Sequence, residues 1–85
     1  MKEKSIITDI ARRYRVKRIF LFGSSLGKKA GRDIDLAVEG LPARDFFRFY
    51  GALLFRLPKP VDLIDLSRDS KFTRLIRREG KLIYG

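Results

Sequence analysis

The chain has 85 residues, at the small end of independently folding domains, so we expect a single domain spanning residues 1–85. No stretch approaches the roughly 18 apolar residues of a membrane span, and the charged first residues lack the apolar segment of a secretory signal, so we expect a cytoplasmic protein with no membrane partner. The absence of Cys and His excludes disulfides, thiolate metal sites and an imidazole base, while a net charge of +10 attracts nucleotides, nucleic acid or an acidic protein.

The first half of the chain predicts one helix followed by two strands. Apolar residues recur every three or four positions over residues 2–14, which is the spacing of an amphipathic helix. Residues 19–22 form a short apolar run, rich in aromatics, that is typical of a buried strand and stops at Gly23. A loop rich in glycine and basic residues follows, and residues 34–38 predict a second strand.

The second half of the chain predicts two helices and at least one strand. Pro42 suits the first turn of a helix with a broad apolar face, which we expect to fill the core. A strand over residues 61–66 follows, and Ser67 or Asp69 is expected to cap a third helix that Gly80 closes. Residues 82–84 predict a final strand or a packed tail. The apolar face of the second helix comprises Phe46, Phe47, Phe49, Tyr50, Leu53, Leu54 and Leu57.

The order of these elements predicts an α+β fold with three to four strands covered by helices in two layers. The connection between the first two strands, residues 23–32, is too short for a full helical crossover. We therefore expect a small mixed β-sheet.

Two acidic residues at the start of the second predicted strand form the first candidate site. Because side chains alternate along a strand, Asp33 and Asp35 lie on one face and Ile34 on the other. Neighbouring carboxylates repel each other unless they are solvated, share a proton or bind a hard cation such as Mg²⁺. Such a pair alone is equally typical of two exposed acids at the start of a strand. Other residues therefore have to distinguish a cation site from a pair of solvated acids.

A glycine–serine turn comes directly after the first predicted strand. Gly23 allows a close approach of the backbone, and the amides that follow it, with the Ser24 hydroxyl, can donate hydrogen bonds to phosphate oxygens. A flexible loop with solvated lysines explains the same residues, and the loop is not a Walker P-loop. The loop supplies further candidates for nucleotide binding, namely Ser25, Lys28, Lys29 and Arg32.

The third predicted strand carries two acids within an apolar segment. Asp62 and Asp65 are three residues apart, so they face opposite sides of a regular strand and only one of them can join Asp33 and Asp35. If Val61 points toward the helices, Asp62 lies on the face of the acidic pair. An exposed strand acid remains the alternative for Asp62, and Asp65 suits a strand end.

Together these features resemble the DNA polymerase β-like nucleotidyltransferase superfamily. The segment FGSSLGKKAGRDIDLAV is similar to the signature of its shortest members, the minimal nucleotidyltransferases. VDLIDL is similar to the strand that carries the third acid of the family, and IRREGKLIY resembles its C-terminal end.

The resemblance implies a Mg²⁺-dependent enzyme that uses ATP or another NTP. Asp33, Asp35 and Asp62 would bind the metal, and Gly23 and Ser24 would hold the terminal phosphates of the nucleotide. Asp62 would also help to deprotonate the acceptor hydroxyl, which attacks the α-phosphate. The resemblance further implies the antitoxin of a toxin–antitoxin pair, with transfer of AMP to a HEPN-domain partner protein.

Two departures from the family pattern concern the phosphate-binding loop. The eight residues between Ser24 and Asp33 make a shorter loop than the family usually has, and Arg32 stands where serine is frequent. A non-catalytic module that neutralises a partner by contact is therefore an alternative function. Binding of nucleic acid is a third, because arginines alternate with aromatics between Arg44 and Arg56.

Overall fold

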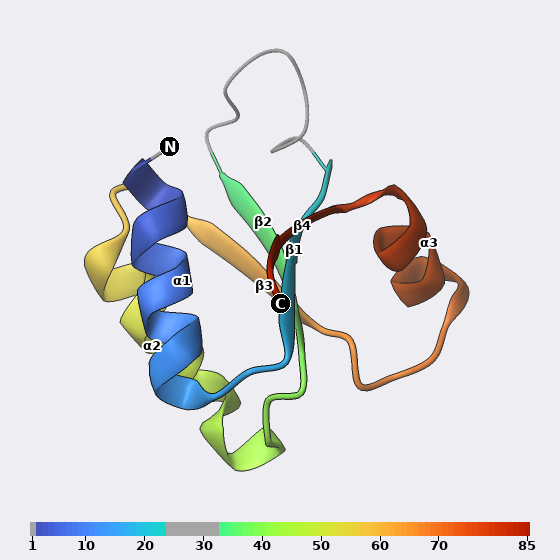
Figure 1. The fold of residues 1–85 in the computed structure, drawn as a ribbon, viewed down its shortest axis with the longest axis horizontal. Helices are drawn as coiled ribbons and strands as arrows, with labels where there is room; N and C mark the ends of the chain where they lie inside the picture. Colours follow the sequence, from blue (N-terminus) through green and yellow to red (C-terminus); the bar gives the residue numbers. More distant parts are fainter. Residues whose placement is uncertain (1, 24–32) are drawn as a thin grey trace.

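The computed structural model describes residues 2–23 and 33–85 (Figure 1). Its strands form one mixed sheet in the order β3-β2-β1-β4, in which β2 and β3 are parallel and the other two pairs antiparallel. The predicted α+β fold and mixed sheet are therefore confirmed. In chain order the elements are α1 (Lys2–Tyr14), β1 (Arg18–Leu21), β2 (Ile34–Glu39), the 3₁₀ helix η2 (Ala43–Asp45), α2 (Phe46–Arg56), β3 (Val61–Asp65), α3 (Lys71–Glu79) and β4 (Lys81–Tyr84).

Helices lie on both sides of the sheet, which divides the core in two (Figure 1). The larger part lies between the sheet and the pair α1 and α2, and it contains Ile19 and Leu21 of β1. Phe20, between them, points to the other face, where it packs with Ile76 of α3. The period of two along a strand produces this division. The two-layer arrangement expected from the sequence thus holds for α1 and α2, and α3 adds a cover on the opposite face.

The amphipathic pattern of α1 is confirmed by its burial. Ile7, Ile10 and Ala11 are buried against the sheet. On the surface, Arg56 Nη1 donates a hydrogen bond to Asp9 Oδ2 at 2.6 Å and so joins the end of α2 to α1. In the part of the chain that the structure describes, no helix has the length and apolar content needed to cross a membrane.

The second helix differs from the prediction at its start and on its surface. Pro42 precedes η2, so the α-helix itself begins only at Phe46. Phe49 and Leu53 are buried, but Phe47 and Leu54, which were expected in the core, are 81% and 49% exposed. The broad apolar face was therefore too wide a prediction, because one sheet face can cover only one side of a helix.

The N-cap of the third helix differs from the prediction. Ser70 is its N-cap, where Ser67 or Asp69 was expected. The Ser70 hydroxyl accepts a hydrogen bond from the Thr73 N–H at 3.1 Å, and the Ser70 N–H donates to Thr73 Oγ1 at 2.9 Å, which forms a capping box. Asp69 instead accepts two hydrogen bonds from Arg74. Gly80 ends the helix as predicted.

Glu39, at the end of β2, joins three parts of the fold. It accepts a hydrogen bond from Arg18 of β1, and its Oε1 lies 3.2 Å from Nη2 of Arg77 in α3. Lys17 Nζ is 3.9 Å from Oε2. Partial burial acts to raise the pKa of Glu39, but the hydrogen bond from Arg18 and the charges of Arg18, Arg77 and Lys17 outweigh it and lower that pKa below 4.5.

Candidate functional site

The strand register places Asp35 directly beside Asp62. In the parallel pair of β2 and β3, Ile34 is opposite Val61 and Asp35 is opposite Asp62. Ile34 and Val61 are buried beneath α1 and α2, so both acidic side chains belong to the opposite face, on the side of α3. This is the face on which the sequence predicted Asp62 to lie. Neighbouring strands are about 4.8 Å apart, so two carboxylates share a small area of sheet surface.

Asp33 extends this acidic group by one further residue. It lies immediately before β2 and is exposed, Asp35 is partly buried, and Asp62 is exposed. Among residues 2–23 and 33–85, no three His, Cys, Asp or Glu side chains gather closely enough to hold a metal ion. The donor chemistry suits a hard cation, because carboxylate oxygens are the ligands that Mg²⁺ prefers. A metal site at these three residues therefore stays a prediction.

Asp65, the other acid of β3, has a different environment. It is the last residue of the strand, and its Oδ1 accepts a hydrogen bond from the Ser67 N–H at 2.9 Å. Asp65 therefore stabilises the turn after β3, which agrees with the strand-end role expected for it.

Gly23, two residues after the end of β1, lies against Asp35 of this acidic group. Its φ is +64°, in the left-handed region that glycine adopts without steric strain. A Cβ at this position would lie 2.8 Å from Asp35 Oδ2, closer than side-chain atoms normally approach. Next to it, the Phe22 N–H donates a hydrogen bond to the carbonyl oxygen of Asp35 at 3.1 Å. The absence of a side chain at residue 23 thus leaves the Asp35 carboxylate directly beside the start of the loop.

The remaining candidates for nucleotide binding lie outside the described residues. They are Ser24, Ser25, Lys28, Lys29 and Arg32. Their proposed contacts with phosphate stay predictions.

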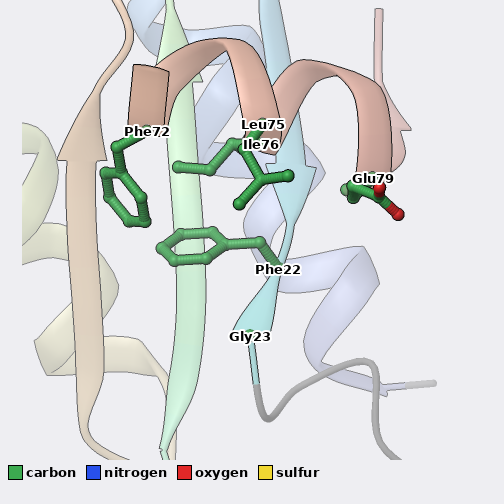
Figure 2. A pocket seen from close by; sticks show the side chains of 7 residues that line it. Phe22, Gly23, Phe72, Leu75, Ile76 and Glu79 are labelled. Carbon is green, nitrogen blue, oxygen red and sulfur yellow. The ribbon is translucent and has the colours of Figure 1, made fainter. Parts of the chain in front are cut away.

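A pocket of about 170 Å³ adjoins Gly23 on the α3 side of the sheet (Figure 2). The Phe22 ring forms its floor below Phe72, and the two rings meet edge to face with centroids 5.9 Å apart. Leu75 and Ile76 of α3 form another apolar part of the pocket wall. The pocket is thus an apolar hollow beside the acidic group.

Two patterns in the sequence relate to this pocket, although neither predicts it. Phe20 and Phe22 have the same parity in the first strand and so share a face. Phe72, Leu75 and Ile76 have the i, i+3, i+4 spacing of one helix face. Neither pattern specifies which helix lies over which sheet face, so the pocket emerges only in the folded chain.

The mixed sheet, the paired acids of β2 and β3 and the glycine bend against Asp35 together define a nucleotidyltransferase fold. The family model described as "Polymerase beta, Nucleotidyltransferase" matches residues 4–85. The chain therefore belongs to the polymerase β nucleotidyltransferase family.

Solved structures of toxin–antitoxin pairs share this fold. A toxin–antitoxin structure with AMP-PNP is similar with a TM-score of 0.77 and 29% sequence identity, covering 96% of this chain and 73% of that chain. A structure of the toxin–antitoxin pair MntA–HepT has a TM-score of 0.74 and 26% identity, covering 99% of this chain and 71% of that one.

A mutant of an MntA–toxin pair is a third similar structure. In it, two aspartates separated by one residue are replaced by glutamate; its TM-score is 0.77 and its identity 26%, covering 100% of this chain and 74% of that one. A comparison with curated proteins gives no significant match. The chain is thus a nucleotidyltransferase-fold domain similar to the MntA antitoxins.

Proposed function

We propose that the chain is a Mg²⁺-dependent nucleotidyltransferase that transfers AMP from ATP to a protein partner, as the cytoplasmic antitoxin of a toxin–antitoxin pair. The observation that carries the proposal is the direct pairing of Asp35 with Asp62, with Gly23 packed against Asp35. The similarity to toxin–antitoxin structures, one of them with AMP-PNP, supports the biological role. The partner would be a HEPN-domain toxin.

Each residue of the site has a role in this reaction. Asp35 and Asp62, which are paired in the sheet, would hold Mg²⁺ together, and Asp33 would join them when the ion and the nucleotide bind; the ion would neutralise phosphate charge and polarise the α-phosphate. Gly23 and Ser24 would bind the terminal phosphates through backbone N–H groups and the serine hydroxyl.

The chemical step is an in-line displacement at the α-phosphorus. The hydroxyl oxygen of the acceptor forms a bond to phosphorus, the bond from phosphorus to the pyrophosphate oxygen breaks, and pyrophosphate leaves. Asp62 would accept the hydroxyl proton, since its side chain is exposed.

The test is transfer of radioactivity from α-³²P-ATP to the purified product of the neighbouring gene in the presence of Mg²⁺. We expect labelling by the wild-type chain and none by Asp35→Asn. Absence of label with the wild type, or equal label with the variant, would refute the proposed activity.

A second candidate is a binding module that neutralises its partner by contact without catalysis. The observation that favours it is the short loop between Ser24 and Asp33, which reduces the number of groups available to bind phosphate. Titration calorimetry distinguishes the two functions. A binding module forms the complex with its partner but shows no Mg²⁺-dependent affinity for ATP.

A further inference from the structure

An apolar stripe runs along the outward side of α2. It consists of Phe47, Gly51, Leu54 and Phe55, which are spaced by i, i+4, i+7 and i+8 and so lie on one side of the helix. The Phe47 and Phe55 side chains are 81% and 90% exposed, and Leu54 is half exposed. Phe49 and Leu53 fill the core from the opposite side of the same helix. The α2 stripe is therefore not part of the core.

The middle of the α2 stripe carries no side chain. Gly51 is exposed, and a Cβ placed on it would have no atom within 4 Å. One turn away on each side stand the phenylalanines at 47 and 55. A protruding apolar side chain of a partner would fit above Gly51 with an aromatic ring on either side. This arrangement resembles the core of a protein interface, where aromatic anchors surround a buried contact.

The charges around the α2 stripe indicate an acidic partner. Among the described residues, neither Arg44 nor Arg48 has an ion pair, whereas Arg56 pairs with Asp9. Arg48 lies at the edge of the α2 stripe, and Arg44 lies just before the helix. A second copy of the chain would bring like charges together, since each copy carries +10. An acidic protein surface would instead complement these arginines.

We infer that the α2 stripe is the docking surface for the protein partner of the proposed function, which presents an apolar side chain flanked by Asp or Glu. The inference rests on the proposed function for the identity of that partner. The α2 stripe belongs to the helix pair on one face of the sheet, and Asp35 and Asp62 lie on the other face. Docking and nucleotide binding are therefore separable by mutation.

The test measures binding of the full chain to the purified product of the neighbouring gene, and separately to Mg²⁺-ATP, by calorimetry. We expect Phe47→Glu/Phe55→Glu to weaken partner binding by about 100-fold or more, because both substituted side chains would be interface anchors. Gly51→Gln would weaken it about tenfold by placing a side chain where the partner would contact the helix, while favouring the helix itself. Both variants are expected to bind Mg²⁺-ATP as the wild type does, which also shows that they are folded.

The matched control is Leu82→Glu, which changes a half-exposed apolar residue of β4 that is paired with Phe20 and faces the other side of the sheet. It is expected to alter partner binding less than threefold.

Full partner binding by the stripe variants, or an equal loss in Leu82→Glu, would overturn the inference. The inference would also be overturned if the wild type formed a concentration-dependent dimer, or bound single-stranded RNA or anionic vesicles, and the stripe variants lost this property while still binding the partner. Partner binding through the α2 stripe without Mg²⁺-ATP affinity would leave the inference standing and refute the proposed activity.

Discussion

Gly23 and Asp35 approach each other so closely that no side chain fits between them. A Cβ on residue 23 would be 2.8 Å from Asp35 Oδ2 and 3.4 Å from its carboxyl carbon. The hydrogen bond from the Phe22 N–H to the Asp35 carbonyl holds the two segments at this separation. The orientation of the Asp35 carboxylate in β2 therefore depends on the glycine that follows β1.

Replacement of Gly23 by alanine is expected to damage both stability and nucleotide binding. The methyl group would displace the Asp35 carboxylate, and the left-handed backbone disfavours alanine by about 1 kcal/mol. Calorimetry should show Mg²⁺-ATP affinity reduced about tenfold or more. Gly51→Ala is the matched control, since it adds a methyl group in open space within α2 and should stabilise the chain by about 0.5 to 1 kcal/mol. Unchanged ATP affinity in Gly23→Ala would show that this contact has no part in the site.

Asp62→Asn is expected to stabilise the metal-free chain while it removes the response to Mg²⁺. Like charges directly opposite each other on adjacent strands are unfavourable, so loss of the Asp62 charge should raise the free energy of unfolding by about 0.5 kcal/mol. Mg²⁺ should stabilise the wild type against urea, because it would bind only the folded state, and it should stabilise this variant much less.

Asp65→Asn provides the control for the change at Asp62. It alters an acid of the same strand that accepts the hydrogen bond from the Ser67 N–H. Its response to Mg²⁺ should equal that of the wild type. If Mg²⁺ stabilises Asp62→Asn as strongly as the wild type, Asp62 is not a metal ligand.

Glu39 should make the fold sensitive to acid. Its pKa in the folded chain is lowered from 4.5, so its ion pairs stabilise the fold fully above that value, and the stabilisation is lost as the pH falls through the lowered pKa. Glu39→Gln should reduce the free energy of unfolding at pH 7 by about 1 to 2 kcal/mol, because three basic side chains lose their partner. The difference between the two proteins should shrink in urea titrations below pH 4.5. A difference that is constant from pH 7 to pH 3 would contradict this account.

The face of the sheet on which Asp35 and Asp62 lie was predictable because strand periodicity determines it. Alternation places Asp33 and Asp35 on one face, and the three-residue spacing separates Asp62 from Asp65. The parallel register that sets Asp35 against Asp62 required the folded chain, since periodicity fixes the face of a strand but not its neighbour. The sequence thus predicts which acids share a face, and the structure adds which of them are adjacent.

The surface of α2 shows where sequence reasoning failed. Its apolar residues surround most of the helix, and a hydrophobic pattern alone gives no reason to separate Phe47 from Phe49. The separation arises because the sheet and α1 cover only one side of α2, which buries Phe49 and leaves Phe47 exposed. Two exposed residues of the α2 stripe, Phe47 and Leu54, were therefore assigned to the core.

The cap of α3 gives a final prediction, on the helix that lies over the pocket. Thr73 is buried, and its hydroxyl donates a hydrogen bond to the Arg68 carbonyl at 2.8 Å while accepting one from the Ser70 N–H. Thr73→Val keeps the shape of the side chain but leaves both backbone groups without this partner. The free energy of unfolding should fall by about 1 to 3 kcal/mol, and amide hydrogen exchange should accelerate most in α3.

Thr8→Val is the control for this change at the cap. Its hydroxyl donates an exposed hydrogen bond to the Ser5 carbonyl at 3.1 Å within α1, so water can replace the lost partner. The effect on stability should be within about 0.5 kcal/mol. Because α3 forms one wall of the pocket beside Gly23, Thr73→Val should also loosen the Phe22–Phe72 contact, which near-ultraviolet circular dichroism can follow. Equal losses of stability in the two variants would mean that the capping box does not hold α3 against the sheet.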